Sequence, residues 1–226
     1  MNVLGAAWLI ARKDLRVEAR SRELIYTTLF FALACVLVFA FAFVREGKPV
    51  ENAAPGILWV AIAFSGTLAL GRTFERERQG ETLRALLLAP VERAAVYLGK
   101  LIALLMLLAA IEALLLPVVG LLFHAPLGRA PWLLLGLVAA GTVGYAGVGT
   151  LFAAMLVRAQ SRDVLLPLLL YPVTVPVIIG GVQGTQAIFA AEPDLAMAGT
   201  WLAMLVFFDA VFVVMALWTF APVMRD

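Results

Sequence analysis

The segment Arg72–Lys100, RTFERERQGETLRALLLAPVERAAVYLGK, decides how the rest of the chain is interpreted. It carries six of the seventeen basic residues and four of the fifteen acidic ones, and long apolar runs lie on both sides of it. A charged segment tethered at both ends to apolar runs is typical of a loop between two membrane-spanning helices. The sequence therefore predicts a membrane protein whose longest charged loop is held to the bilayer at both ends.

A short helix is predicted inside this loop, over residues 80–90. Gly80 can end a preceding helix, and Glu81 and Thr82 suit a first helical turn, where acids and short hydroxyls favour unpaired N–H groups. Leucines then recur at i, i+3 and i+4, on one helical face; they are Leu83, Leu86 and Leu87. Pro90 stops this helix and can start the next one as its first residue. The apolar face favours a partner protein, and the alternative is a merely solvated basic loop.

The composition indicates an all-α integral membrane protein with a single transmembrane domain, residues 1–226. The chain is 64% hydrophobic and 14% charged, with a mean hydropathy of +1.01, whereas soluble domains carry about 25% charged residues. No soluble domain fits between the apolar runs. The only cysteine, Cys35, excludes an intrachain disulfide and a cysteine metal cluster. We expect membrane lipid around the chain, and no bound metal and no nucleic-acid partner.

Six apolar runs are long enough to cross a bilayer, and an amphipathic segment precedes them. In residues 3–23 the apolar positions, Trp8 among them, recur on one helical face and three arginines on another, which predicts a helix lying in the membrane interface. Residues 183–197 are predicted to form a polar loop with room for a short outer helix. The predicted spans are residues 24–44, 55–70, 97–123, 132–157, 164–182 and 199–220.

Basic residues are distributed unevenly between the two ends of these spans. The N-terminal segment has five Lys or Arg, the 72–100 segment six, the turn at 158–163 two and the C-terminal tail one. The alternate loops hold only Arg45, Lys48 and Arg129. Cytoplasmic loops are enriched in Lys and Arg. The sequence therefore predicts a multi-pass protein of a bacterial inner membrane with both termini in the cytoplasm.

Two carboxylates are predicted to lie at mid-depth in the membrane. Glu112 lies about 22 Å along the third span and Asp209 about 15 Å along the sixth, at 1.5 Å per residue. We expect no basic side chain to neutralise them, so each is protonated, hydrogen-bonded or in contact with water. Buried acids of this kind have either a functional role or a plain packing role, and both readings stay open.

Two further spans carry unusual residue patterns. The fifth contains Tyr171-Pro172-Val173-Thr174-Val175-Pro176, and each proline removes a backbone hydrogen bond, which predicts a kinked or broken helix facing protein or a cavity. The fourth has small residues spaced by four, which favours close packing against another helix and leaves a sliding surface or a substrate groove as the alternative; they are Gly136, Ala140 and Gly144.

Catalytic signatures within this chain are weak. Ser65 and His124 are expected at different depths, so they do not suit a serine nucleophile and its base, which need a hydrogen bond. His124 as an iron ligand is a minor alternative to an ordinary loop residue. Gly99-Lys100 lacks the earlier glycine of a phosphate-binding loop, since Ala94 stands there. We therefore expect no enzyme activity in this chain, and ATP to be hydrolysed by a separate subunit.

Three stretches together resemble the heme exporter protein B family (CcmB) of cytochrome c maturation. They are the stretch from Pro55 to Val60, PGILWV, the stretch from Phe74 to Lys100 with its Leu-Leu-Ala-Pro, and the stretch from Tyr171 to Pro176. The likeness covers essentially the whole chain. The 72–100 pattern alone resembles the permease subunit of a type-2 ATP-binding cassette exporter, in which residues 80–90 match the coupling helix that fits a cleft on the ATPase.

The resemblance implies a permease that works with other proteins. These are a cytoplasmic ATPase subunit (CcmA), a heme-handling membrane protein (CcmC), a small helper (CcmD) and a periplasmic heme chaperone (CcmE), with two copies of the permease in the complex. It also implies that ATP hydrolysis is linked to release of the heme-loaded chaperone, with heme as the candidate substrate. The alternatives are a permease for lipid, polysaccharide or drug, and a non-transporting membrane scaffold.

Overall fold

The computed structural model describes residues 2–45, 48–49, 53–73, 92–157 and 159–223. Within these ranges, six helices are long and apolar enough to cross a membrane, and a seventh precedes them. The prediction of an all-α membrane protein is therefore confirmed. A pair of two-residue antiparallel strands, β1 (Val44–Arg45) and β2 (Lys48–Pro49), follows the first long helix. The helices are α1 (Val3–Ser21), α2 (Glu23–Ala42), α3 (Ala53–Thr73), α6 (Arg93–Phe123), α7 (Pro131–Met155), α8 (Arg162–Phe189) and α9 (Leu195–Val223).

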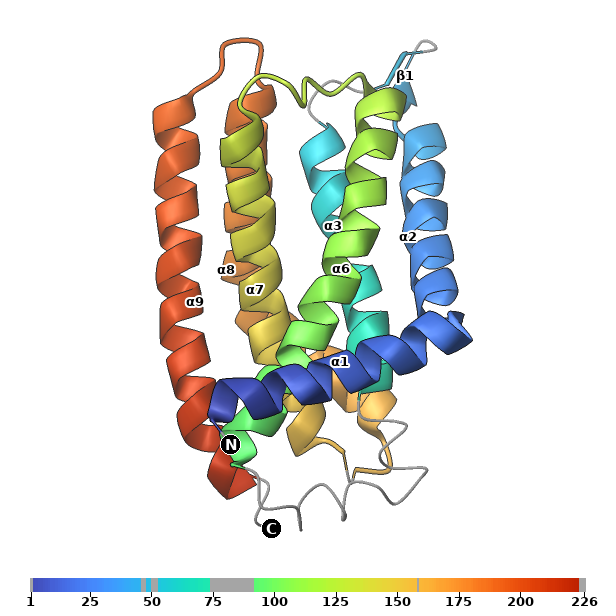
Figure 1. Ribbon diagram of the computed structural model, residues 1–226. Helices are drawn as coiled ribbons and strands as arrows, with labels where there is room; N and C mark the ends of the chain where they lie inside the picture. Colours follow the sequence, from blue (N-terminus) through green and yellow to red (C-terminus); the bar gives the residue numbers. More distant parts are fainter. Residues whose placement is uncertain (1, 46–47, 50–52, 74–91, 158, 224–226) are drawn as a thin grey trace.

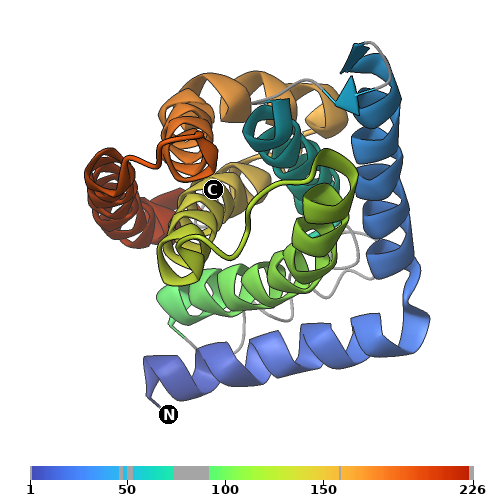
Figure 2. The same cartoon turned by 90° about the horizontal axis from the view of Figure 1, so that it is seen from above.

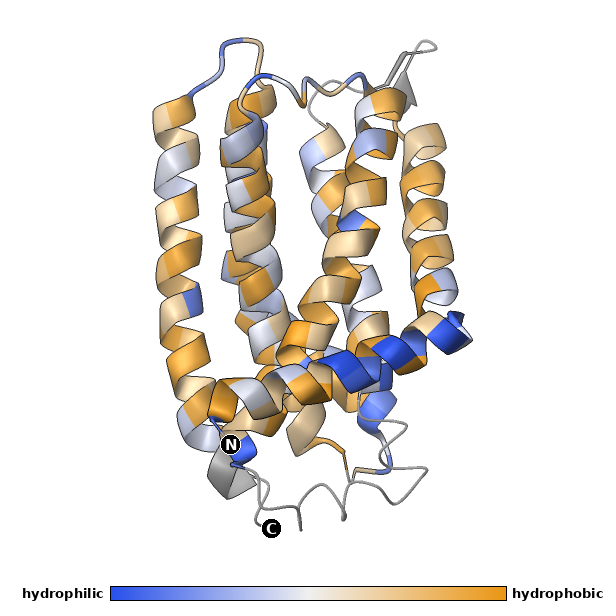
Figure 3. Cartoon of the chain, viewed as in Figure 1, coloured by the Kyte–Doolittle hydropathy of each residue, from blue (hydrophilic) through white to orange (hydrophobic). Residues whose placement is uncertain are grey.

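The six long helices lie side by side as a bundle, and α1 crosses one end of it (Figure 1). We refer to this as the α1 end of the bundle. Viewed along the bundle, α1 lies beside α6 and runs toward the start of α2 (Figure 2). Hydrophilic residues gather along α1 and at the end that it crosses (Figure 3). A helix that lies across the ends of membrane spans, with polar and apolar faces, is an interfacial helix.

The sharp corner between α1 and α2 has a local cause. Arg22 adopts a left-handed conformation, φ 55°, and its backbone N–H bonds to the carbonyl oxygen of Glu18, which ends α1. The Glu18 carboxylate then accepts the backbone N–H of Ile25 in the first turn of α2, 3.0 Å away. A carboxylate at a helix N-terminus satisfies an unpaired N–H group and complements the helix dipole. The Glu18 side chain thus caps the N-terminus of the first membrane span.

The centre of the bundle is formed by α3 and α7, which are the most buried of the six long helices, whereas α2 and α9 are the least buried. The largest side chains enclosed in the described part are Trp59 and Tyr97. The Trp59 ring occupies the space in which side chains at Gly141 of α7 and Gly181 of α8 would lie. Its indole N–H donates to the Thr185 hydroxyl at 3.0 Å. Trp59 therefore joins α3 to both α7 and α8.

Several predicted boundaries differ from the observed ones. α8 continues to Phe189, so residues 183–189 are helical where a polar loop was predicted. Thr185 is fully buried on Trp59 and Gly184 packs against Leu137, so the polar composition of this turn faces protein. α6 begins at Arg93 behind an extended Glu92, and Pro90 is therefore not its first residue. The helix ends follow these tertiary contacts, which composition alone does not report.

Candidate functional site

The predicted coupling helix lies outside the residues that the structure describes. Its residues, Gly80, Glu81, Thr82, Leu83, Leu86, Leu87 and Pro90, therefore keep the standing of a prediction. The helices on either side of it are described: α3 ends at Thr73 and α6 begins at Arg93, both at the α1 end (Figure 1).

Lys100 holds the end of α3 and the underside of α1 to α6. Its side chain is 3% exposed; its Nζ lies 2.8 Å from a carboxylate oxygen of Asp14 and donates to the carbonyl oxygen of Thr73 at 3.2 Å. The preceding residue, Gly99, has no side chain, and this lets Ala7 and Ile10 of α1 approach the α6 backbone. A lysine ammonium can donate three hydrogen bonds. We call Lys100, Asp14 and Thr73 the lysine clamp.

A second buried cation holds the same helix from the other side. Arg162, at the start of α8, is 3% exposed and donates to the carbonyl oxygen of Leu70 at 3.0 Å. The Leu70 side chain fills the space beside Gly149 of α7. The last turn of α3 is therefore fixed by contacts with α6, α7 and α8. Sequence reasoning missed both cations, because a basic residue near the end of a span is usually an interfacial anchor.

The two intramembrane carboxylates do not come together. The Thr142 hydroxyl of α7 donates to the Glu112 carboxylate of α6, which is 6% exposed. Asp209 of α9 lies instead against Gly144, where the missing side chain leaves room for its carboxylate. Positions 142 and 144 of one helix point in different directions. Glu112 and Asp209 thus contact α7 on different faces, and no basic side chain among the described residues forms an ion pair with either of them.

Tyr171 belongs to a hydroxyl cluster that joins α3, α7 and α8. The Thr67 hydroxyl lies 2.6 Å from that of Tyr145 and 3.1 Å from that of Tyr171. Tyr145 also donates to the carbonyl oxygen of Ala63 at 2.7 Å, and its ring fills the space beside Gly66. Hydroxyl groups from three helices therefore form hydrogen bonds with one another inside the bundle. Sequence analysis singled out Tyr171 and missed its partners Thr67 and Tyr145.

The prolines of α8 do not interrupt it. The helix runs continuously from Arg162 to Phe189 with Pro172 and Pro176 inside it, so the prediction of a broken helix is wrong, while a kink stays a prediction. The buried Thr174 hydroxyl bonds to the carbonyl oxygen of Leu170 at 2.9 Å. Neighbouring helices and local hydroxyls sustain proline-containing spans in this way.

The small residues of α7 lie where α7 packs most extensively, against α9. Gly136 contacts the Leu202 side chain and Gly144 contacts Phe208 and Asp209, all from α9. Ala140, between them, is buried in a cluster that includes Leu205 of α9. This arrangement matches close helix packing. A sliding surface or a substrate groove at this place stays untested.

The residues considered for catalysis are engaged in structural roles. The buried Ser65 hydroxyl donates to the carbonyl oxygens of Ala61 and Ile62 in its own helix. His124 caps the far end of α6 with φ 51° and is exposed. Among the described residues, no three His, Cys, Asp or Glu side chains gather in a way that could hold a metal ion.

Comparison with known proteins identifies the family. The model of the CcmB protein family matches residues 5–226. The chain belongs to the CcmB family. The resemblance derived from the sequence is thus confirmed, and it extends beyond the loop to all six long helices.

The relatives of this CcmB-family chain share one name, heme exporter protein B. The relative from Paracoccus denitrificans (strain Pd 1222) is 34% identical over 187 residues, which cover 82% of this chain and 85% of the relative. The relative from Pseudomonas aeruginosa is 29% identical over 197 residues, 87% of each chain. The relative from Escherichia coli (strain K12) is 38% identical over 96 residues, which cover 42% of this chain and 44% of the relative.

Proposed function

We propose that this chain is the membrane permease subunit of an ATP-driven complex for cytochrome c maturation, in which it handles heme. The observation that carries this proposal is the likeness, over more than four-fifths of both chains, to a protein named heme exporter protein B. The CcmB family match over nearly the whole chain supports it. In this proposal a separate cytoplasmic subunit hydrolyses ATP, and hydrolysis is coupled to release of a heme-loaded periplasmic chaperone.

The proposed orientation places the α1 end in the cytoplasm of an inner membrane. The basic residues of α1 and those at the described ends of α3, α6 and α8 lie at this end, the latter being Arg72, Arg93, Lys100 and Arg162. The positive-inside rule supports this orientation. The predicted helix at residues 80–90 would then meet a cytoplasmic ATPase, and a heme-handling membrane protein, a small helper and a second copy of this chain would complete the assembly.

The contacts around the 72–100 segment support a mechanism for coupling. A push on residues 80–90 acts on the end of α3 and the start of α6, which the lysine clamp holds together. α3 carries the motion to mid-depth through Trp59, which joins it to α8, and through Thr67, which joins it to α7 and α8. A rigid connection of this kind turns a displacement at the loop into rearrangement of the helices around Tyr171.

A charge placed on the predicted apolar face tests this function. We expect Leu86→Arg to abolish copurification of the ATPase subunit and the stimulation of its ATP hydrolysis, because arginine cannot enter an apolar cleft without a partner. Ala85→Arg adds the same charge on the opposite side of the predicted helix and is the matched control. Equal recovery of the ATPase with both variants would contradict the proposed contact.

The substrate requires its own measurement. In cells that depend on this chain for cytochrome c maturation, we expect Leu86→Arg to remove covalently bound heme from c-type cytochromes, detected by heme staining of denatured protein. Ala85→Arg should leave it in place. Normal covalent heme together with lost ATPase coupling would instead indicate a permease for a different substrate, and normal values of both would favour a scaffold.

A further inference from the structure

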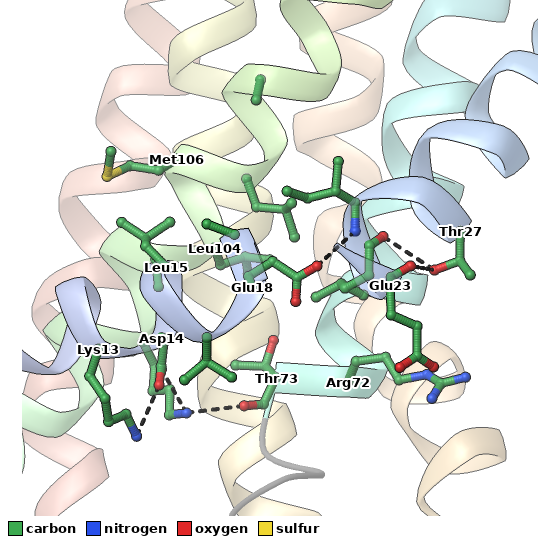
Figure 4. Close-up of a pocket in the computed structure, with 18 residues that line it drawn as sticks. Lys13, Asp14, Leu15, Glu18, Glu23, Thr27, Arg72, Thr73, Leu104 and Met106 are labelled. Atoms are coloured by element: carbon green, nitrogen blue, oxygen red, sulfur yellow. Dashed lines mark hydrogen bonds and ion pairs between the residues drawn. The ribbon is translucent and has the colours of Figure 1, made fainter. Parts of the chain in front are cut away.

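A cavity of about 760 Å³ lies where α1, the start of α2, the end of α3 and α6 meet (Figure 4). It is separate from the hydroxyl cluster and from Glu112 and Asp209, none of which lines it. Its two parts differ in chemistry. α6 supplies an apolar wall, whereas α1 and the helix ends supply charged side chains. The apolar wall consists of Ala103, Leu104, Met106, Leu107 and Ala110.

The charged rim is balanced between the two signs. Among the residues that the structure describes, three basic and three acidic side chains line the cavity; they are Lys13, Arg72 and Lys100, and Asp14, Glu18 and Glu23. Figure 4 shows Lys13 and Asp14 on one side, Glu23 and Arg72 on the other, and Glu18 between them. Asp14 is paired with both lysines, at 2.9 and 2.8 Å. A rim of this kind suits a group that carries one positive and one negative charge.

The rim and the wall lie at different depths. From Lys100 to Ala110 the wall runs ten residues along α6, about 15 Å, and this length suits an acyl chain. α1 crosses the ends of the spans, so the rim lies at the level of lipid headgroups (Figure 1). Met106 and Ala110 are exposed, so the apolar wall reaches the surface that faces the bilayer. A molecule with a charged head and an apolar tail fits both parts.

We propose that this cavity binds one phospholipid with a zwitterionic headgroup, with its phosphate toward Arg72, its ammonium toward Glu18, and one acyl chain along α6. Phosphate pairs with lysine and arginine, and ammonium pairs with carboxylates. An anionic lipid such as phosphatidylglycerol brings no ammonium group to the Glu18 carboxylate, and neither does a porphyrin dianion. The site stands on the cavity and its charges, and it does not depend on the direction or the substrate of transport.

Lipid retention by the purified full-length protein tests the proposal. The protein is delipidated, incubated with vesicles of equal parts phosphatidylethanolamine and phosphatidylglycerol, and analysed by native mass spectrometry. We expect one phosphatidylethanolamine per chain. Ala110→Trp places a large ring over the apolar wall and should lower retention by about tenfold, an equilibrium change of about 1.4 kcal/mol. Ala109→Trp makes the same change at an exposed neighbour that does not line the cavity, and it should retain the lipid.

A second pair of variants addresses the headgroup and guards against a folding defect. Arg72→Gln should lower retention of phosphatidylethanolamine, whereas Arg20→Gln, an exposed arginine of α1 outside the cavity, should not. Equal retention by Ala110→Trp and Ala109→Trp, or preferred retention of phosphatidylglycerol, would overturn the proposal. Displacement of the lipid by hemin at equal concentration would also overturn it and would mark the cavity as a substrate site.

Discussion

Lys100 of α6 is a single charged residue that holds α1 and α3 in place at the edge of the membrane. Its side chain is 3% exposed and Asp14 is 20% exposed, so the lysine is the more deeply buried partner of this pair. Removing one partner of a buried ion pair costs more than removing both, because the remaining charge stays without compensation. Asp14 also contacts the half-exposed Lys13. Lys100 therefore depends more on Asp14 than Asp14 depends on Lys100.

This inequality predicts the order of stability in a set of variants. Asp14→Ala should lower the free energy of unfolding by about 3 kcal/mol, because it leaves the Lys100 ammonium buried without its carboxylate. Lys100→Met should cost about 1 kcal/mol, because Asp14 keeps Lys13 and the apolar stem is preserved. Thermal unfolding in detergent checks this order. The double variant should be more stable than Asp14→Ala alone; if it is less stable, the charge argument fails.

Glu112 differs from Lys100 because its partner is neutral. The Thr142 hydroxyl donates to it, so a neutral side chain of the same shape with an acceptor oxygen, such as glutamine, can replace it. We expect Glu112→Gln to keep near-normal stability and Glu112→Ala to lose about 1–3 kcal/mol more, since alanine leaves the hydroxyl unpaired and a gap between α6 and α7. Unfolding of the two purified variants makes the comparison, and equal losses would show that the charge itself is required.

The depth of the polar residues was predictable, and their partners were not. Counting residues along a span places Glu112 and Asp209 far from the interface, since each residue adds about 1.5 Å. Which neighbour faces each acid depends on how the helices rotate against one another, and a single sequence does not report that rotation. The sequence therefore predicted Glu112 and Tyr171 as candidates but not Thr142, Thr67 or Tyr145.

At the scale of elements, glycines set the distances between helices. Gly141 of α7 and Gly181 of α8 leave the space that the Trp59 ring of α3 fills. The polar end of α8 packs against the same ring, because the Thr185 hydroxyl accepts a hydrogen bond from the Trp59 indole N–H. The loop predicted at residues 183–197 was wrong over residues 183–189, because composition cannot distinguish a polar segment in water from one buried between helices. The long apolar runs carried no such ambiguity.

The contact between Trp59 and Gly141 predicts that a smaller residue at position 59 relieves the cost of a larger one at position 141. Gly141→Ala should destabilise the protein by about 1–3 kcal/mol, because its new methyl group overlaps the Trp59 ring. Gly56→Ala, on α3 with open space beside it, is the control and should have little effect. In a Trp59→Leu background the cost of Gly141→Ala should nearly vanish. Additive costs in the double variant would mean that the ring and the glycine are not coupled.

At the scale of the whole molecule, one end of the bundle carries more of the described charged residues than the other. Charged residues of α1, of the described ends of α3 and α6 and of the start of α8 lie at the α1 end, although they lie far apart in sequence (Figures 1 and 3). The alternation of spans and loops predicted this arrangement, since each span reverses the side of the membrane. The cavity and the lysine clamp at the α1 end were less predictable, because both depend on α1 packing against α6.

The proposed orientation predicts which positions can be labelled from outside. In a Cys35→Ser background, a membrane-impermeant maleimide applied to intact spheroplasts should label Gly128→Cys, in the turn between α6 and α7. It should reach Ser161→Cys and Thr82→Cys only after the membrane is broken. Labelling of Thr82→Cys in intact spheroplasts would reverse the orientation and remove the proposed contact with a cytoplasmic ATPase.

The lysine clamp also has a consequence for the order in which the protein is assembled. α1 is synthesised before α6, yet its Asp14 partners with a lysine of α6 that is synthesised 86 residues later. Until the third span is inserted, α1 lacks its packing against α6, which is more extensive than its packing against α2. Ribosome-bound chains that stop before residue 100 should therefore leave α1 open to protease, and longer chains should protect it. α1 is thus synthesised before α2 and α3 but is fixed in place only after α6 has been made.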